Sequence, residues 1–466
     1  MSRKGGIISG GFQPLKAPDA PTVDSVSAGV LSADVTFSAP SNTGDGTIDS
    51  YVITAKQSDG TSASATASAA GTTSVSLTVG GTTTFAAQAL SEYGPGQFSG
   101  FGNSTSVPTG QELYTWGAGG DGRLGLNNTI NRSSPVQVGA LTTWSQVSVG
   151  SAQTFAIKTD NTLWSWGVGD NGRLGQNDRL FYSSPVQVGA LTNWGRVSSK
   201  NKHTAAVKTD GTLWTWGYGY QGQLGNNSRS PFNRSSPIQI GSLTDWYKIS
   251  TGNSHTASVK TDGTLWTWGF NSSGQLGHNN TTARSSPVQV GALTTWAQVS
   301  AGGNHTGAVK TDGTLWMWGN NSAGQLGHNN RTALSSPVQV GALNNWSQIS
   351  SGNNHITAVK TDGTLWAWGT NSSGELGDSA IINRSSPVQV GALTTWAQAS
   401  SGFQWSAAVK TDGTLWTWGT EGDGRLGQNV LIRRSSPVQV GALTTWSQVS
   451  AAAGGSHGGA INQSFT

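Results

Sequence analysis

The 466-residue chain contains no cysteine, so it can form neither a disulfide bond nor a thiolate metal site. Charged residues make up only 10% of it, and no run of lysine or arginine occurs, although the formal net charge is +4. Such a small and dispersed excess of positive charge is not the basic patch that a nucleic-acid-binding protein presents. We therefore expect no nucleic-acid partner.

Long apolar segments are also missing. No stretch approaches the roughly 18 consecutive apolar residues of a membrane-spanning helix. The opening, MSRKGGIISGGFQP, lacks the apolar run of roughly 7–15 residues that a signal peptide requires. We expect no membrane insertion. If the protein acts outside a cell, it is expected to leave by a route other than an ordinary signal peptide.

Glycine and tryptophan are abundant, with 66 and 21 residues respectively. Residues that favour helices are sparse, whereas residues that favour strands and turns are common, which predicts an all-β protein. A Trp-Gly pair recurs seven times at intervals of 50 or 52 residues, and SSPVQVG or SSPIQIG also occurs seven times, followed each time by another tryptophan. A period near 50 in a β-rich chain indicates a β-propeller or a β-solenoid. The glycines of the seven pairs are Gly117, Gly167, Gly217, Gly269, Gly319, Gly369 and Gly419.

Each repeat is expected to form four short strands. In GAVKTDGTLWMWG (307–319), two strand-like runs flank Asp312-Gly313, a hairpin signal in which both turn residues are expected to have positive φ. SPVQVG reads as a strand that begins at its proline, and TTWAQVSAG (294–302) reads as the fourth. Seven units of four strands fit a seven-bladed propeller, with the tryptophans packed between blades.

The two ends of the repeat region are complementary. The first copy, QELYTWG (111–117), lacks the strand that precedes the Trp-Gly strand in every other copy, and the last segment, HGGAINQSFT (457–466), supplies one. We therefore predict that the segment around Ile461 pairs with the segment around Leu113. The ring would then close through one blade built from both ends of the chain.

The stretch VSAGGNHTGAVKTDGTLWMWGNNSAGQLG (299–327) resembles the repeat of the regulator of chromosome condensation family. This resemblance covers residues 111–466 and implies a seven-bladed β-propeller. Residues 17–108 show short alternating strands separated by Gly, Pro and Asn turns, which predict a β-sandwich and resemble a fibronectin type III domain. Phe37 stands where that family has a core tryptophan, and Thr83 stands near its corner tyrosine. The predicted domains are a flexible or docking arm (1–16), the β-sandwich (17–108) and the propeller (109–466).

Histidine occupies one repeat position in five copies, and a structural hydrogen bond at the start of a strand is the expected role, since seven such positions cannot converge on one metal ion. Three aspartates in Gly-rich loops, Asp121, Asp170 and Asp423, lack the ligand density of a calcium loop. We predict no metal site, no cofactor and no enzymatic activity. The histidines at the shared position are His203, His255, His305, His355 and His457.

Departures from the repeat mark candidate partner-binding residues. They are aromatic or cationic and gather mainly in the second and third copies of the Trp-Gly repeat. Two explanations of these departures are open: sequence drift in solvent-exposed loops, and a binding surface for a protein or glycan partner. The candidates are Phe181, Tyr182, Lys200, Lys202, Tyr218, Tyr220, Phe232 and Trp405.

The opening MSRKGGIISGGF is similar to the first residues of bacteriophage virion proteins. With the composition and the expected sandwich, it favours a non-enzymatic structural or adhesive protein of a phage tail, fibre or capsid-associated appendage. Its N-terminal region would dock on other virion proteins, and the propeller would meet a host-surface glycan or protein, with homo-oligomers also allowed. The alternative is a secreted or surface-bound bacterial adhesin that binds carbohydrate. A guanine-nucleotide exchange factor, suggested by family analogy alone, is the least supported option.

Overall fold

The computed structural model describes residues 16–464, apart from 30–31, 59, 78–80, 93, 108–109 and 229–232. The predicted arm therefore lies outside the described residues except for Lys16. The chain forms two compact units, one reaching Gly110 and including the chain end from Gln463, the other spanning Gln111–Asn462. No helix in the described part of the chain is both long and apolar enough to cross a membrane.

The first unit contains two antiparallel sheets that share one hydrophobic core. One has the strand order β1-β2-β5, and the other has the order β4-β3-β6-β7 with β8 also paired to β6. Every second residue of β2 is buried, which places Ala33, Val35 and Phe37 in the core. The resemblance to fibronectin type III stays a prediction. The strands are β1 (Thr22–Gly29), β2 (Ser32–Ser38), β3 (Ile48–Lys56), β4 (Ser62–Ala67), β5 (Gly71–Ser76), β6 (Gly81–Ser91), β7 (Gly94–Phe98) and β8 (Ser104–Val107).

The second unit, in its described residues, consists of seven four-stranded antiparallel sheets, which we call blades 1 to 7. Blade 1 is β11 (Trp144–Val149), β12 (Gln153–Lys158), β13 (Leu163–Gly167) and β14 (Tyr182–Gln187). Blade 2 is β15 (Trp194–Ser199), β16 (His203–Lys208), β17 (Leu213–Gly217) and β18 (Arg234–Gln239). Blade 3 is β19 (Trp246–Thr251), β20 (His255–Lys260), β21 (Leu265–Gly269) and β22 (Arg284–Gln289). Blade 4 is β23 (Trp296–Ala301), β24 (His305–Lys310), β25 (Leu315–Gly319) and β26 (Leu334–Gln339).

Blade 5 is β27 (Trp346–Ser351), β28 (His355–Lys360), β29 (Leu365–Gly369) and β30 (Arg384–Gln389). Blade 6 is β31 (Trp396–Ser401), β32 (Trp405–Lys410), β33 (Leu415–Gly419) and β34 (Arg434–Gln439). Blade 7 is β35 (Trp446–Ala451), β36 (His457–Ser464), β9 (Gly110–Gly117) and β10 (Arg132–Gln137). Two 3₁₀ turns, η1 (Gly120–Gly122) and η2 (Asp170–Gly172), follow β9 and β13.

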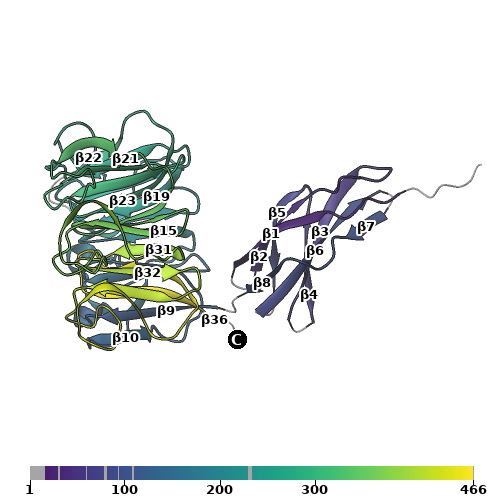
Figure 1. Ribbon diagram of the computed structural model, residues 1–466, viewed down its shortest axis with the longest axis horizontal. Coiled ribbons are helices and arrows are strands. Elements are labelled where there is room, and N and C mark those ends of the chain that lie inside the picture. The colour runs from purple at the N-terminus through teal and green to yellow at the C-terminus, as the bar shows by residue number, and fades with distance from the viewer. Residues whose placement is uncertain are drawn as a thin grey trace, which may run out of the picture. The chain divides into compact units, whose positions relative to one another are not determined.

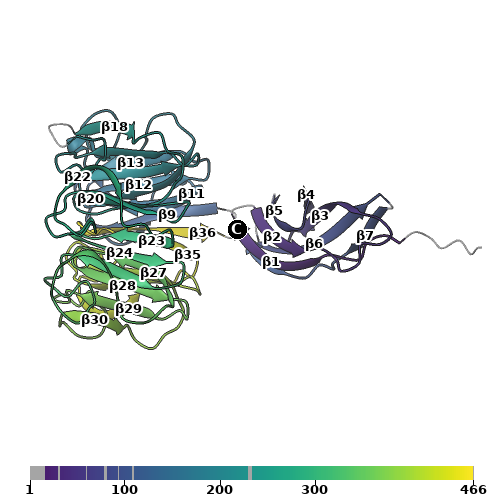
Figure 2. The ribbon, with the colours of Figure 1, turned by 90° about the horizontal axis from the view of Figure 1, so that it is seen from above.

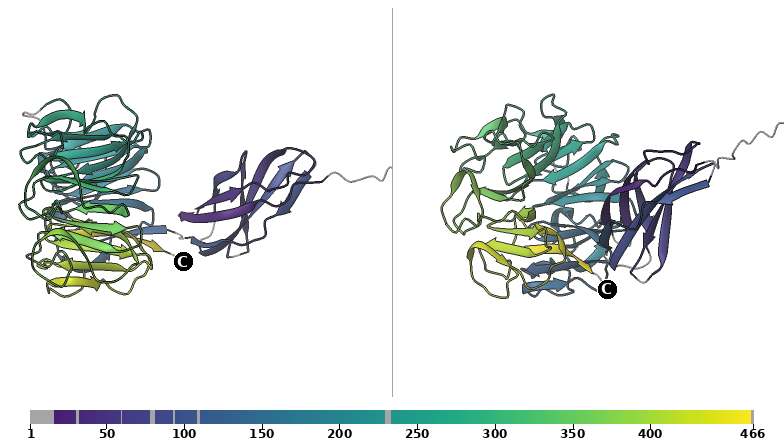
Figure 3. Two further views of the ribbon diagram at one scale, coloured as in Figure 1. Left: turned by 45° about the horizontal axis from the view of Figure 1, so that its top comes forward. Right: turned by 45° about the vertical axis from the view of Figure 1, so that its right-hand side comes forward.

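The blades follow one another around a ring in chain order, as the colour gradient shows (Figure 2 and Figure 3). The first strand of each blade contacts that of the next, and β35 contacts β11, so the ring is closed. Blade 7 has the order β10-β9-β36-β35 and is built from both ends of the chain (Figure 1). Leu113 and Ile461 are buried in one cluster there, in the sheet arrangement that the sequence predicts.

Tryptophan packs the spaces between blades. Trp216 is fully buried among residues of blades 1 and 2, while Trp214 is partly exposed. Both lie edge-on to Trp194, with ring centroids 6.0 Å apart in each case. The Lys208 ammonium lies 3.8 Å from the Trp214 ring centroid and 5.2 Å from that of Trp194, a cation–π arrangement that recurs in blades 1 to 6. The repeated Lys and Trp residues therefore hold the scaffold together.

Two local expectations are wrong. In the Asp312-Gly313 turn only Gly313 has a positive φ, of 77°, and its N–H donates to the Lys310 carbonyl oxygen at 3.0 Å. The aspartate instead accepts hydrogen bonds from the Thr314 N–H and hydroxyl, and the Thr314 hydroxyl accepts one from the Trp316 indole. Pro337 is the fourth residue of β26, not the first, and lies at a register shift on the outer strand of its blade, where its missing N–H breaks no ladder bond.

Candidate binding site

Each blade is a four-stranded meander, so its loops divide between the two faces of the ring. The long-loop face carries the connections between first and second strands and those between third and fourth strands. The short-turn face carries the Asp-Gly turns and the GALTTW-type connections to the next blade, which are almost identical in all copies. Among the candidates, Lys202, Tyr218 and Tyr220 belong to connections on the long-loop face.

In four of the five copies the repeated histidine makes a structural hydrogen bond, as predicted, and this bond joins neighbouring blades. His203 Nε2 lies 2.9 Å from the Thr256 hydroxyl of the next blade, and that hydroxyl donates to the Gln223 carbonyl oxygen at 2.9 Å. The hydroxyl proton is thereby committed, so His203 carries its proton on Nε2. Burial lowers the pKa of His203, His255 and His355 to about 3, which keeps these rings neutral. Their role is structural.

Trp405 replaces this histidine in blade 6, and its proposed role in partner binding is wrong. Its side chain is 0% exposed. The residue of blade 7 that would be the hydroxyl partner is Gly458, and a Cβ atom added there would lie 3.0 Å from Trp405 and 2.6 Å from Trp116. The large indole therefore occupies the space that a threonine, serine or, in blade 5, isoleucine side chain fills at the other boundaries. This departure is a packing compensation.

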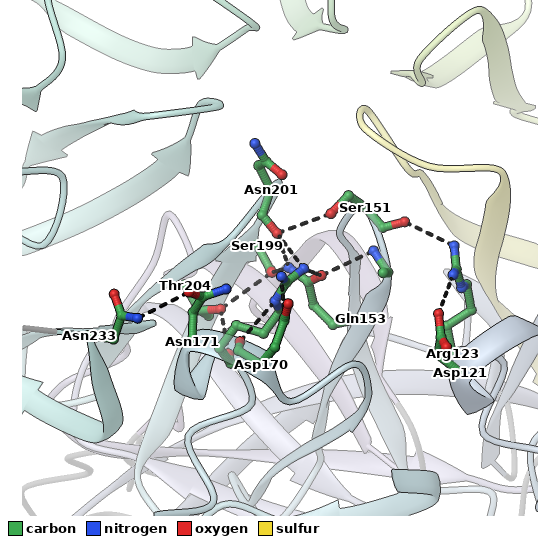
Figure 4. Close-up of polar contacts among 12 residues, drawn as sticks. Asp121, Arg123, Ser151, Gln153, Asp170, Asn171, Ser199, Asn201, Thr204 and Asn233 are labelled. Atoms are coloured by element: carbon green, nitrogen blue, oxygen red, sulfur yellow. Dashed lines mark hydrogen bonds and ion pairs between the residues drawn. The ribbon is translucent and has the colours of Figure 1, made fainter. Parts of the chain in front are cut away.

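Gln153 replaces the histidine in blade 1 and completes a polar cluster (Figure 4). Its Nε2 donates to the Ser199 hydroxyl and to the Asn201 carbonyl oxygen, both at 2.8 Å, and its Oε1 accepts from Arg173 Nη1 at 3.4 Å. The glutamine amide donates and accepts at the same time, so it bonds to blade 2 and also accepts a hydrogen bond from the Arg173 guanidinium.

The three loop aspartates are partners of arginines. Asp170 is paired with Arg173, Asp121 with Arg123 at 2.9 Å and Asp423 with Arg425 at 3.3 Å. Across the described residues, no group of three or more His, Cys, Asp or Glu side chains is placed to hold a metal ion. The role of these aspartates is therefore to hold the arginine side chains of their own loops by ion pairs.

Lys200 is also buried, with 6% exposure, contrary to its expected place on a surface. Five other copies have glycine at this position. The Lys200 ammonium reaches from blade 2 to carbonyl oxygens of blades 4 and 5, at 2.6 Å from Ala301, 2.6 Å from Ser351 and 3.4 Å from Gly352. Burial lowers its pKa to about 7. Lys200 therefore links non-adjacent blades through the interior of the ring.

Lys200 makes the stability of the propeller depend on pH. A lysine whose pKa is about 7 when folded and near its ordinary 10.5 when unfolded binds more protons in the unfolded state between these values. Relative to Lys200→Met, the wild-type free energy of unfolding should rise by about 1.4 kcal/mol per pH unit from pH 7 to pH 10.5 and be flat below pH 7. Urea titrations followed by Trp fluorescence at each pH measure this difference. Parallel pH profiles for the two proteins would contradict it.

Three of the eight candidates form an exposed cluster on blade 2. The rings of Tyr218 and Tyr220 lie 5.0 Å apart, and the Lys202 ammonium lies 5.9 Å from the Tyr218 ring centroid. The Tyr218 N–H donates to the Lys202 carbonyl oxygen at 2.9 Å, which ties the two loops together. Tyr220 is 43% exposed and Lys202 is also exposed.

The other candidates are not part of this cluster in the described contacts. Phe181 is 55% exposed at the end of the blade 1 loop. Tyr182 is half-buried, donates a 2.6 Å hydrogen bond to Asp178, and packs between core clusters, and this bond raises the pKa of its phenol. Phe232 lies outside the described residues.

Two further residues that depart from the repeat, Arg196 and Lys248, are not among the candidates from the sequence. In five blades a glutamine on the innermost strand accepts the backbone N–H of the next blade, as Gln298 does from Ile349 at 2.9 Å. Arg196 and Lys248 stand at this position in blades 2 and 3 and have no acceptor atom to offer. Each such bond contributes roughly 0.5–1.5 kcal/mol. Comparison of the copies at the residues after the strand-initial tryptophan would have revealed both.

Comparison with known proteins supports the fold. The family model described as RCC1-like domain matches residues 98–463. Human WBSCR16 is similar in structure, with a TM-score of 0.69 and 20% identity over 76% of this chain and 100% of that one. Prp20p from Saccharomyces cerevisiae has a TM-score of 0.68 and 18% identity over 77% of this chain and 92% of its own. No curated protein sequence matches significantly. At these identities the structural likeness establishes the fold alone.

Proposed function

The chain belongs to the family of RCC1-like domains, and on that basis we propose that it is a non-enzymatic binding protein whose propeller recognises a surface glycan or protein through the long-loop face of blade 2. The observation that carries this proposal is the exposed cluster of Lys202, Tyr218 and Tyr220. Two adjacent phenol rings offer flat apolar area with hydroxyl groups, and the lysine adds a cation. This mixture is characteristic of binding surfaces for sugars and proteins.

The regularity of the scaffold supports the choice of this cluster. Trp405, Gln153 and Lys200 depart from the repeat but are buried and have structural partners. Tyr218 and Tyr220 have no such explanation, because other copies fold with threonine or serine at the same positions, as at Thr370 and Ser372. These two aromatic side chains, of which Tyr220 is exposed and Tyr218 is half-buried, are therefore not required by the fold.

We expect the double substitution Tyr218→Thr and Tyr220→Ser to weaken ligand binding at least about tenfold, since aromatic anchors dominate such interfaces. Both new residues occur naturally at these positions in other blades, so the unfolding temperature should change little. Binding is measured on a glycan array and to bacterial cells. The matched control is Phe270→Thr, the same repeat position in blade 3. Equal binding by the wild type and the double variant would refute the site.

The setting we propose is a bacteriophage virion, as part of a tail, fibre or capsid-associated appendage that docks through its N-terminal region. The support is the composition and the similarity of MSRKGGIISGGF to the first residues of virion proteins. A secreted or surface-bound bacterial adhesin would use the same binding face and differs in location. Mass spectrometry of purified virions and of cell-surface fractions separates the two, and a chain absent from the virions would exclude the first.

Yeast Prp20p, one of the proteins with a similar structure, binds Gsp1p and histones. That property belongs to Prp20p, and 18% identity carries no more than the fold to this chain. Nothing in the described contacts distinguishes a surface for a GTPase. We therefore propose no nucleotide-exchange activity, and a nucleotide-release assay that detected it would revise this view.

A further inference from the structure

We propose that Gly195, Arg196, Tyr247 and Lys248 form a second binding site, on the short-turn face between blades 2 and 3, for a small sugar-like ligand that carries a carboxylate or phosphate group. This site lies on the opposite face from Lys202, Tyr218 and Tyr220. It is defined by residues that differ from all the other copies at positions where those copies agree closely.

The boundary contains a cavity of about 450 Å³, a volume suited to a ligand of one or two sugar units. Its walls include Gly195, Arg196 and Tyr247 together with the invariant Trp246 and the Asp210-Gly211 turn. Five other copies have serine or alanine at the position of Gly195, and blade 3 has Tyr247 there. The glycine leaves room on one side of the boundary, and the tyrosine forms a wall on the other.

Two cations meet at Tyr247, which is 43% exposed. The Arg196 guanidinium carbon lies 4.6 Å from the centroid of the Tyr247 ring, and the Lys248 ammonium lies 5.1 Å from it. Among the described residues, neither cation has a carboxylate within ion-pair distance. Since a guanidinium presents paired donors that match a carboxylate or phosphate, Arg196 is the expected anion contact.

The one carboxylate in the cavity wall is already engaged within the turn. Asp210 Oδ1 accepts hydrogen bonds from the Thr212 N–H at 2.9 Å and from its hydroxyl at 2.6 Å, and Oδ2 accepts one from Asn193 at 3.4 Å. Asp210 is therefore not the counter-ion of Arg196. Its remaining acceptor capacity, with the hydroxyl of Thr209 or Thr244, suits the hydroxyl groups of a sugar.

The two cations are not explained by the needs of the fold. At five boundaries a glutamine at this position bonds to the next blade, and the two consecutive boundaries that lack the glutamine are those that carry Arg196 and Lys248. Both substitutions give up a structural hydrogen bond and place positive charge beside the Tyr247 ring; Arg196 lines the cavity itself, and Lys248 lies against the tyrosine that forms its wall. Functional sites are where a repeat is expected to break its own rules.

The test is isothermal titration calorimetry with three probes of similar size: glucuronate, glucose 1-phosphate and glucose. We expect glucuronate or glucose 1-phosphate to bind, glucose to bind at least about tenfold more weakly, and the affinity to fall with added NaCl. The comparison of the two anions identifies which group the site prefers. Arg196→Gln should abolish the preference for the anion, while its unfolding temperature should equal or exceed that of the wild type, because the variant restores the glutamine found in five blades.

The control is Arg331→Thr, which replaces an exposed cation on the long-loop face with the residue that blade 3 has at the same position and should leave binding of the probes unchanged. Absence of saturable binding by both anions, equal binding of glucose, or unchanged affinity in Arg196→Gln would each overturn the proposal. Binding through Tyr218 and Tyr220 is unaffected by Arg196→Gln, so the failure of either site is recognised independently of the other.

Discussion

A chain truncated after Ser456 is expected to lose the unfolding transition of the intact propeller and to melt at least about 10 °C lower. The truncation removes β36, which lies between β35 and β9 in blade 7. It would leave two strand edges unpaired and remove Ile461 and Ala460 from two core clusters. It would also break the link between His457 and the Thr154 hydroxyl of blade 1, at 3.1 Å.

Tryptophan fluorescence measures this effect selectively. All 21 tryptophans lie between Trp116 and Trp446, within the second unit, so their signal reports on the propeller alone. Thermal melts followed by fluorescence should therefore show the loss, whatever happens to the first unit. The matched control removes only residues 463–466, which takes the last two residues from β36 and leaves its buried part in place, and should shift the transition much less. Equal melting of the two truncated proteins would show that closure through β36 does not stabilise the ring.

The fold could be predicted because the information is local and repeated. The Trp-Gly and SSPVQVG motifs set the period, and the missing strand at one end matched the surplus strand at the other. The structural role of the repeated histidine followed from the same repetition, whereas the structure alone shows that its hydrogen bond crosses to the next blade. The Asp-Gly turn was misread because the same dipeptide fits two hairpin types: a two-residue type I′ turn, in which both residues have positive φ, and a type I turn followed by a glycine bulge, in which only the glycine does.

The candidate site could be predicted only in part because burial depends on partners in other blades. Lys200 and Lys202 are two residues apart in the sequence, yet one ammonium reaches carbonyl oxygens about 100 and 150 residues away and the other is exposed. Trp405 looked like an exposed anomaly because its explanation, Gly458, lies in the next blade. Arg196 and Lys248 were visible in the sequence, but their meaning required the glutamine bonds of the other five blades.

The pairing of Trp405 with Gly458 predicts a compensating double substitution. Trp405→His alone should destabilise the propeller by about 2–4 kcal/mol, because a small ring replaces a fully buried indole and leaves a cavity. Gly458→Thr alone should also destabilise it, since the new side chain meets Trp405 and Trp116 at less than normal contact distance. Either substitution by itself therefore harms the boundary between blades 6 and 7.

The double variant Trp405→His with Gly458→Thr recreates the pair that joins blade 2 to blade 3, where His203 bonds to Thr256. Its loss of unfolding free energy should be smaller than the sum of the two single losses by about 1–3 kcal/mol, which lies within the usual range for residues in contact. Urea denaturation of the four proteins gives this coupling energy. The boundary between blades 4 and 5 provides the comparison: Ile356 stands there at the position of the hydroxyl partner, and His305 Nε2 has no partner among the described residues. Histidine without a hydroxyl partner is thus tolerated at that boundary. Additive effects in the double variant would mean that Trp405 and Gly458 do not compensate each other, and would contradict their pairing.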